Sequence, residues 1–416
     1  MSGEAEANRY LSLDAIRGVA VMGIILLNAF SFTMPDAAYI NPLAWGGTRA
    51  IDVAAWGSNF VLFEGKMRGL FSLLFGASMA LVIDRARAKG EGGASIHYRR
   101  LFWLLLFGLA HHLLIWEGDI LVQYALIGMI AYVFVKRSNR TLRRWAIGLL
   151  ALSVLMHVGM IAGSYALKAL AEAPGASAEA RKGYGEMLNS FSKPGSKGVR
   201  EDLETYRADY PAILAVRAGE MRGAIIGTIA IFGLETLGLM VLGILLLRNG
   251  FLTNGWEAAR YQRWAVRSYV IGIPPLIALA YWNFAIGFDT HAVFATWAAW
   301  AEPFKYAVMF GHASLAMLLL ARFAGSPLVA RIAAAGRAAF SNYIGTSLVM
   351  TSLFYGYGAG LFGHVGRAEV YLFILAIWAA ILLWSKPWLE RYRYGPFEWL
   401  WRSLSRGETQ AMRRDA

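Results

Sequence analysis

The feature that most constrains this chain is the recurrence of long apolar segments separated by short connections. An α-helix needs about 20 mostly apolar residues to cross a bilayer, and about ten segments meet that length. The sequence therefore predicts an all-α fold, a polytopic integral membrane helix bundle with about ten transmembrane helices. The predicted spans are 14–33, 64–84, 99–116, 119–136, 143–168, 223–247, 266–287, 303–323, 338–357 and 369–386.

Composition supports this prediction. Only 16% of the 416 residues are charged, whereas about 25% is usual in soluble domains. The chain has no cysteine, which excludes disulfides and thiolate chemistry. The first apolar run is long and has no evident cleavage site, so we interpret it as an uncleaved span.

The basic residues predict the orientation. With both termini in the cytoplasm, 26 of the 40 Lys and Arg residues fall on the cytoplasmic side and five in the short outer loops. The remaining nine lie in the long connection between the fifth and sixth spans. The net charge of +13 is therefore explained by anchoring to the cytoplasmic leaflet. This distribution favours membrane lipids as partners and gives no support to nucleic acid.

We interpret 1–416 as a single membrane domain with a cytoplasmic tail at 387–416 and a soluble helical insertion at 169–222 on the outer side. The insertion pattern predicts two or three short helices, broken at Pro194 and Gly195. It is either a spacer or a lid over an outer-facing cavity. The stretch "LGLMVLG" allows tight helix contacts within one chain or between chains, so oligomerisation is possible.

Four titratable residues interrupt the segment "LFWLLLFGLAHHLLIWEGDILVQYALIGMIAYVFV": His111, His112, Glu117 and Asp119. Ionisable groups at membrane depth are costly and are functional candidates. His111 lies roughly 18 Å along the third span, in its outer half. His112 points elsewhere around the helix, so one of the two faces lipid or a neighbour. Asp119 either caps the fourth span or supports His111, and His111 is either a catalytic base or a structural histidine.

The second span begins with "FEGKMRGLFSLLFG". Glu64 and Arg68 are four residues apart, a spacing that predicts an ion pair on one helix face. Lys66 lies between them near the predicted outer interface. These groups either snorkel to the headgroups or line an outer vestibule together with Asn28 and His111.

Glu235 lies close to the predicted midplane of the sixth span, where a carboxylate either pairs with a buried base or is neutral. His157 and His312 lie at similar depth on the fifth and eighth spans. They either join Glu235 in a proton relay or act as structural links between helices.

The inner end of the first span carries Asp14 and Arg17, three residues apart on one helix face. Asp14 either caps the helix while Arg17 anchors it, or Arg17, Arg99 and Arg100 form a cationic mouth for an anionic cytoplasmic ligand. Arg337 is a further candidate for this mouth. The guanidinium fork suits phosphate. No motif for a metal site, a phosphate-binding loop or a serine nucleophile occurs, so we expect no metal cofactor.

Five ordered blocks resemble the YeiB-like family of bacterial inner-membrane proteins, which carry a domain of unknown function. The blocks are "SLDAIRGVAVMGIILLN", "FEGKMRGLFSLLFGASMAL", "RRLFWLLLFGLAHHLLIWEGDILVQYALIG", "GRAAFSNYIGTSL" and "RYRYGPFEWLWR". The resemblance covers nearly the whole chain and implies a multi-pass protein of the bacterial inner membrane.

The first block also resembles the opening of the transmembrane acyltransferase superfamily, which includes heparan-α-glucosaminide N-acetyltransferase. Those enzymes resemble one another in an Asp-x-x-Arg-Gly at the inner end of the first span. They take an acyl group from coenzyme A inside and deliver it outside. The resemblance implies that Asp14, Arg17 and Gly18 lie on the donor side and Asn28 near the reaction centre. In the heparan enzyme the active-site histidine lies in the outer loop after the first span, and that loop has no histidine here.

Three functions remain open from the sequence. The first is an acyltransferase in which an acyl-CoA donor binds Arg17, Arg99, Arg100 and Arg337, and a small-molecule or sugar acceptor is deprotonated by His111. In that hypothesis Asp119 or Glu117 supports the base and Asn28 stabilises the oxyanion. The second is a proton-coupled transporter or exporter that uses Glu235, His157 and His312. The third is a lipid-binding membrane protein without turnover.

Overall fold

The computed structural model describes residues 3–47, 49–190 and 195–414, and every regular element within those ranges is a helix. The prediction of an all-α membrane bundle is confirmed. The long helices are α1 (Gly3–Thr33), α4 (Lys66–Ala88), α5 (Gly93–Leu114), α7 (Asn139–Glu172), α10 (Tyr210–Arg248), α11 (Ala258–Ala285), α13 (Glu302–Arg322) and α16 (Arg367–Arg391).

Shorter elements complete the bundle. The helices are α2 (Ala37–Ile40), α3 (Ala50–Leu62), α6 (Leu121–Ala131), α8 (Ala178–Ser190), α9 (Lys197–Tyr206), α12 (Thr290–Ala295), α14 (Pro327–Arg337), α15 (Ala339–Phe354) and α17 (Pro396–Arg406). Two 3₁₀ turns lie at η1 (Tyr132–Phe134) and η2 (Phe251–Thr253), and the π-helical turn η3 spans Thr296–Trp300.

Within the described residues, seven helical segments are long and apolar enough to cross a membrane. Each of the ten predicted spans coincides with helix, but the spans predicted at 99–116, 119–136 and 338–357 fall on α5, on α6 with η1, and on α15, which are not among the seven. The α6–η1 segment is apolar and short. The three further spans, which would bring the number to ten, therefore stay a prediction.

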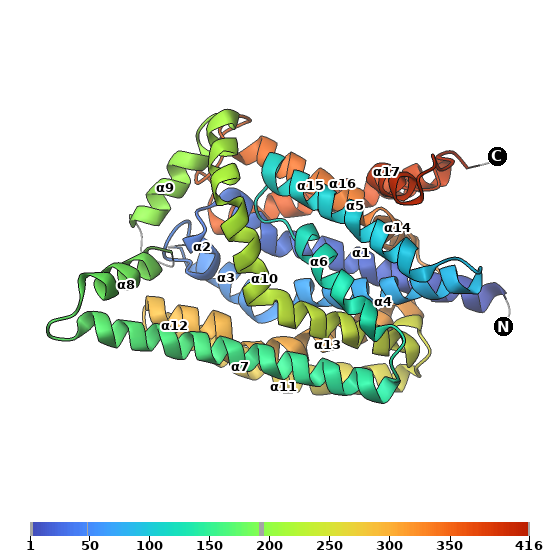
Figure 1. Cartoon of the computed structure of the whole chain (residues 1–416), viewed down its shortest axis with the longest axis horizontal. Coiled ribbons are helices and arrows are strands. Elements are labelled where there is room, and N and C mark those ends of the chain that lie inside the picture. The colour runs from blue at the N-terminus through green and yellow to red at the C-terminus, as the bar shows by residue number, and fades with distance from the viewer. Residues whose placement is uncertain (1–2, 48, 191–194, 415–416) are drawn as a thin grey trace.

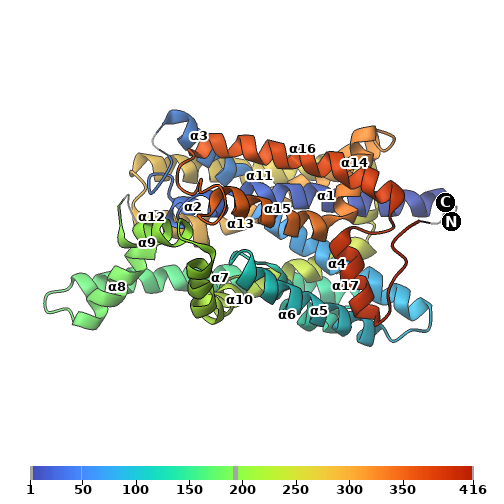
Figure 2. The same cartoon turned by 90° about the horizontal axis from the view of Figure 1, so that it is seen from above.

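The two chain ends lie at the same end of the bundle, and α8 and α9 lie at the opposite end (Figures 1 and 2). We call these the terminal end and the distal end. The shared position of the termini fits an even number of spans. That the terminal end faces the cytoplasm stays a prediction from the basic residues.

The connection between α7 and α10 contains the two short helices α8 and α9, as the sequence predicts. Pro194 lies outside the described residues, and Gly195 follows with a φ of +75°. The long helices extend further into this connection than expected, because α7 runs to Glu172 and α10 begins at Tyr210. Asp209 caps α10 by accepting a hydrogen bond from the Ala212 N–H at 3.1 Å.

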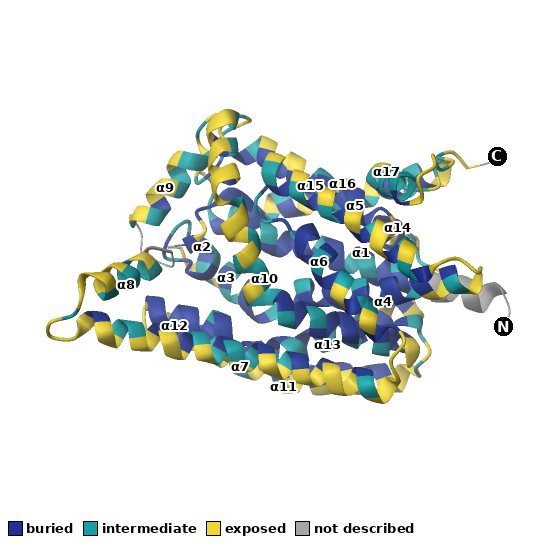
Figure 3. Cartoon of the chain, viewed as in Figure 1, coloured by how far each residue is buried: buried dark blue, intermediate teal, exposed yellow. Residues whose placement is uncertain are grey.

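Burial separates central helices from peripheral ones (Figure 3). The first span, on α1, is mostly buried, whereas only a minority of the apolar residues of α7, α11 and α16 are fully buried. Exposed apolar side chains on α7 include Ile147, Leu152 and Leu155. In water such a band would be costly, so these outer faces are the surface that lipid covers.

Helices α4 and α10 contact each other through glycine. A Cβ added at Gly76 would lie 2.1 Å from the Met240 carbonyl oxygen, and one added at Gly243 would lie 1.8 Å from the Leu73 carbonyl oxygen. Only glycine allows these backbones to approach so closely. Both glycines lie eight residues beyond the polar groups Arg68 and Glu235 on the same two helices.

We predict that Gly243→Ala lowers the free energy of unfolding by about 1–3 kcal/mol, because the methyl group must displace the backbone of α4. Thermal or denaturant unfolding of the purified protein in detergent measures this. The matched control is Gly227→Ala on the same helix, since an added Cβ there meets no atom within 4 Å. Equal stability of the two variants would contradict the close helix contact.

Candidate functional site

The centre of the candidate site is a buried pair formed by His111 and Asp119. His111 Nδ1 lies 2.9 Å from Asp119 Oδ1, and the other carboxylate oxygen accepts the Val122 N–H at 2.8 Å. Asp119 therefore both caps the first turn of α6 and holds the imidazole. The two interpretations of Asp119 that the sequence left open are compatible.

The orientation of the ring follows from this contact. A carboxylate on one ring nitrogen favours the proton on that nitrogen and leaves the other nitrogen basic. His111 is only 1% exposed, and among the described residues its Nε2 has no hydrogen-bond partner. The imidazole is thus buried in the bundle and presents an unused basic nitrogen.

Glycine on α5 makes this pair possible. A Cβ added at Gly108, one turn before His111, would lie 2.6 Å from the Val122 backbone nitrogen. The start of α6 can therefore pack directly on α5. This close contact brings Asp119 beside His111.

Aromatic residues surround the imidazole. The His111 ring centroid is 5.0 Å from that of Tyr343 on α15 and 6.3 Å from that of Trp116. Trp116 stacks on Phe32 of α1 at 4.0 Å. His111 therefore lies where α5, α15 and the distal half of α1 meet.

A narrow fissure between α1 and α15 passes this position. Asn28 lines it, and so does Tyr343, the neighbour of His111. The space open to a water-sized ligand is about 10 Å³, roughly one water molecule. Its complete lining is Val21, Ile24, Ile25, Asn28, Ala29, Phe32, Tyr343, Thr346, Ser347 and Met350.

The fissure approaches the cationic terminal end of the bundle. Val21 lies one helical turn from Arg17, on the same face of α1. Arg17 pairs with Asp14 at 3.0 Å and donates to the Ser78 hydroxyl on α4 at 2.8 Å. The predicted proximity of Asp14 and Arg17 is confirmed.

Other arginines gather near this end. The Arg100 guanidinium stacks on Trp401 of α17 at 4.1 Å, and the Trp401 indole N–H donates to the Arg100 carbonyl at 2.8 Å. Arg402, Arg406 and Arg17 are close enough to Arg100 to repel its charge. Arg100 and Arg17 are thus within electrostatic reach of each other, and Arg402 and Arg406 of α17 are further cations that the sequence analysis did not name.

The remaining two predicted donor residues are exposed at the terminal end. Arg99 lies beside Arg100 on α5. Arg337 ends α14 and acts electrostatically on Asp14. Both are exposed, whereas Arg17 and Arg100 are half-buried.

Glu117 has a different role from the one predicted. Its carboxylate accepts hydrogen bonds from the Tyr206 hydroxyl and the Arg217 Nε, each at 2.9 Å. Burial and the neighbouring Glu117 charge hold the pKa of Tyr206 well above its usual range, so this hydroxyl stays protonated and donates. Glu117 ties α9 and α10 to the α5–α6 turn, and Asp119 is the carboxylate on His111.

His112 does not face lipid. It is 3% exposed and lines a small pocket on the α10 side of α5, together with Glu117, Asp119 and Gln123. The adjacent histidines thus point in different directions from α5, and both are buried.

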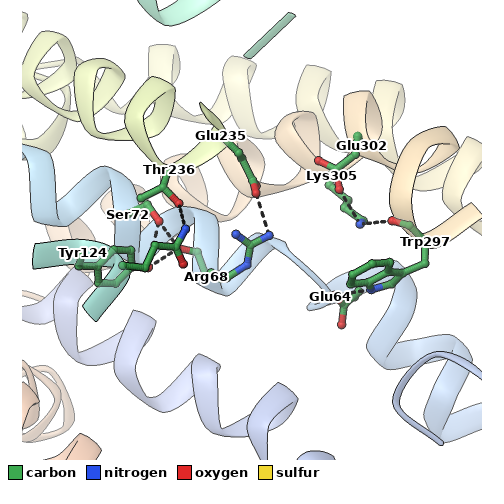
Figure 4. A network of polar contacts seen from close by, with 10 residues as sticks. Glu64, Arg68, Ser72, Tyr124, Glu235, Thr236, Trp297, Glu302 and Lys305 are labelled. Carbon is green, nitrogen blue, oxygen red and sulfur yellow. Dashed lines mark hydrogen bonds and ion pairs between the residues drawn. The ribbon is translucent and has the colours of Figure 1, made fainter. Parts of the chain in front are cut away.

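The predicted ion pair between Glu64 and Arg68 is wrong. Gly65 adopts a φ of +73° and α4 begins only at Lys66, so Glu64 lies outside the helix and the four-residue spacing does not apply. Arg68 instead pairs with Glu235 of α10 at 2.8 Å (Figure 4). Glu64 accepts the Trp297 indole N–H at 3.2 Å.

Snorkelling is also wrong for Lys66, which is 0% exposed and donates to the Phe60 carbonyl at 2.6 Å. Nor do these residues share a vestibule with Asn28 and His111. Glu64 lines a separate pocket near α3, whereas Asn28 lines the fissure between α1 and α15.

The Arg68–Glu235 pair belongs to a buried polar network that crosses α4, α6, α10 and α13 (Figure 4). Lys305 pairs with Glu302 at 2.8 Å and donates to the Trp297 carbonyl at 2.8 Å. Further contacts join Ser72 to Tyr124 at 2.9 Å and Gln123 to Thr236 at 2.7 Å. Glu235 therefore pairs with a buried base, which is one of the two alternatives that the sequence left open.

The predicted histidine relay is only partly assembled. His312 Nε2 lies 2.6 Å from the Leu62 carbonyl and its Nδ1 lies 2.9 Å from the Tyr269 hydroxyl, so both nitrogens are engaged. This arrangement is that of a structural link between helices. His157 is buried on α7, within electrostatic reach of Glu302 and Arg68.

The fold and these buried groups define a polytopic helical membrane protein with polar sites inside the bundle. The chain belongs to the YeiB family. It is 32% identical to uncharacterized protein YeiB of Escherichia coli over 412 residues, which covers 95% of this chain and 96% of that protein. It is 28% identical to uncharacterized protein YxaH of Bacillus subtilis, over 94% of this chain and 93% of that protein.

The family described as "Protein of unknown function (DUF418)" matches residues 246–408. This range contains α15 with Tyr343, and it also contains α17, whose Trp401 contacts Arg100. The catalytic candidates on α1 and α5 precede it.

We predict that removing one partner of the Arg68–Glu235 pair is more harmful than removing both. Glu235→Leu leaves a buried guanidinium uncompensated and lowers the free energy of unfolding by about 3–5 kcal/mol. The double variant Arg68→Met with Glu235→Leu recovers most of this loss. Unfolding of the purified protein measures both.

The control for this prediction is Glu390→Gln, which removes an exposed ion pair with Lys386 and costs at most about 1 kcal/mol. A double variant that is as unstable as the sum of its single variants would show that the two side chains do not interact.

Proposed function

We propose that this protein is a membrane-embedded acyltransferase that moves an acyl group from a cytoplasmic acyl-CoA donor to a hydroxyl or amine acceptor at the outer face of a bacterial inner membrane. The observation that carries the proposal is the buried His111–Asp119 pair, in which the imidazole Nε2 has no partner among the described residues. Tyr343, whose ring contacts that imidazole, lines the fissure between α1 and α15.

The chemistry follows from the geometry of this pair. Asp119 orients the imidazole and stabilises the charge that it acquires when Nε2 removes a proton from the acceptor. The acceptor oxygen or nitrogen then attacks the thioester carbonyl and a C–O or C–N bond forms. The C–S bond breaks, and the coenzyme A sulfur leaves as the thiol with the proton that His111 removed from the acceptor. Asn28 lines the same fissure, and its amide N–H suits the developing oxyanion.

Donor binding is proposed at the terminal end. Arg17 and Arg100, with Arg402 and Arg406 from α17, form a cationic cluster that suits the phosphates of coenzyme A. Arg99 and Arg337 are exposed at the same end of the bundle. The pantetheine arm then extends along the face of α1 that carries Arg17, Val21 and Asn28, and the fissure must widen to admit it.

We predict that Arg17→Ala weakens acetyl-CoA binding roughly ten-fold or more, because it removes a charge-assisted contact. Titration calorimetry of the protein in nanodiscs measures this. Arg263→Ala, an exposed arginine on α11, is the matched control.

We predict that His111→Ala keeps acetyl-CoA binding within about two-fold and loses transfer of labelled acetyl to membrane or sugar acceptors.

The control for transfer is His364→Ala, an exposed histidine in the loop before α16. Unchanged acetyl-CoA binding in Arg17→Ala would contradict the proposed donor site. Undiminished acetyl transfer in His111→Ala would show that His111 is not the base.

The second candidate function is proton-coupled transport, and the buried network of Arg68, Glu235, Glu302 and Lys305 favours it. Carboxylates inside a helix bundle that alternate between binding a proton and pairing with a basic side chain are a recurrent element of proton pathways. This function uses no residue of the acyl-transfer site.

If the protein moves protons, Glu235→Gln abolishes acidification of liposomes under an imposed membrane potential, measured with an enclosed pH-sensitive dye and normalised to folded protein. Glu257→Gln at the exposed start of α11 leaves the flux unchanged. Proton flux that persists in Glu235→Gln would exclude this carboxylate from the path.

A further inference from the structure

A second pocket lies near the distal end, between α3, the end of α11 and the π-helical turn η3. Its polar lining includes Asn59, Glu64, Asn283 and Thr296. It shares no lining residue with the fissure between α1 and α15. The inference drawn from it therefore goes beyond the proposed acyl transfer.

Three buried oxygen atoms line this pocket without a partner. Asn59 Oδ1, Asn283 Oδ1 and Thr296 Oγ1 have no hydrogen bond to any described residue, and the three residues are 7%, 1% and 1% exposed. An unsatisfied buried polar atom costs free energy. Three around one pocket indicate that a ligand satisfies them.

The amide orientations are defined by hydrogen bonds to backbone. Asn59 Nδ2 donates to the Leu26 carbonyl at 3.3 Å, and Asn283 Nδ2 donates to the Leu279 carbonyl at 2.9 Å. Only the NH₂ group of an amide can donate to a carbonyl, so the oxygen of each side chain is the atom left unused. The ligand must therefore present positive charge or hydrogen-bond donors.

Glu64 provides the negative charge of the pocket. Its carboxylate accepts the Trp297 indole N–H at 3.2 Å and a hydrogen bond from the Tyr39 hydroxyl. It forms no ion pair with any described residue. The neighbouring cations are directed elsewhere: Arg68 pairs with Glu235, and Lys305 pairs with Glu302. The Lys66 ammonium donates to the Phe60 carbonyl.

Pocket size and walls narrow the class of ligand. The space open to a water-sized ligand is about 20 Å³, roughly one or two water molecules. Trp56 and Trp297 form part of the wall, and aromatic faces attract cations. A carboxylate, two amide oxygens and a hydroxyl form a set of hard oxygen ligands.

We propose that this pocket binds one small monovalent cation, an alkali metal ion or ammonium, through Asn59, Glu64, Asn283 and Thr296. Binding satisfies the three unused oxygens and compensates the Glu64 charge. Because Trp297 contacts both Glu64 and Lys305, the ion also stabilises the position of η3 beside the Arg68–Glu235 network.

The test is the thermal unfolding midpoint of the full-length protein in nanodiscs, in NaCl, KCl, NH₄Cl or choline chloride at one ionic strength. Wild type shows a saturable rise of the midpoint with a small cation and none with choline, which is too large for the pocket. The ion with the lowest half-saturation concentration identifies the ligand. Equal midpoints in all four salts overturn the proposal.

Variants locate the effect. Glu64→Gln and Asn283→Leu raise the half-saturation concentration roughly ten-fold or more, since each removes a ligand atom. Asn139→Leu, an exposed asparagine at the start of α7, behaves as wild type. The milder Thr296→Val covers the case in which the other variants do not fold. Unchanged half-saturation in the folded variants overturns this location.

Discussion

Every polar group inside this bundle must find a partner within the protein, and that constraint determines how its helices meet. A buried guanidinium on α4 requires a carboxylate, and Glu235 on α10 supplies it at 2.8 Å. Glycine contacts between the same two helices keep them close enough for this pair. The same rule places Asp119 beside His111 and Glu117 beside Arg217. Packing and polar pairing are therefore parts of one arrangement.

Several buried polar atoms among the described residues are exceptions to this rule, and four of them lie at the two proposed sites. The Nε2 of His111 and the oxygens of Asn59, Asn283 and Thr296 are buried without partners among the described residues. The first belongs to a ring that contacts Tyr343 of α15, and the others line the pocket near η3. Natural sequences retain such costly groups mainly where a ligand completes them. The two sites are therefore where chemistry and binding are proposed.

Much of the architecture was predictable, because hydropathy places a residue along the membrane normal. It identified the helices, and the short turn between two of them allowed a contact between His111 and Asp119 as one of two roles for Asp119. Hydropathy does not say which helices are neighbours, so the Arg68–Glu235 pair was missed and a local pair with Glu64 was predicted instead. The left-handed conformation of Gly65, which places Glu64 outside the helix, has no clear signal in the sequence. For α17 a signal existed, since in "PFEWLWRSLSR" two aromatic residues, Phe397 and Trp401, and two basic residues, Arg402 and Arg406, are each four residues apart, as on one face of a helix.

The acyl-transfer proposal depends on a path between the arginine cluster and His111 along one face of α1. An electron cryomicroscopy map of the protein with a non-hydrolysable acyl-CoA analogue tests it most directly. The account predicts phosphate density against Arg17 and Arg100, and an extended arm between α1 and α15 that ends at His111. Density elsewhere, or an empty and unwidened fissure at saturating analogue, would contradict it.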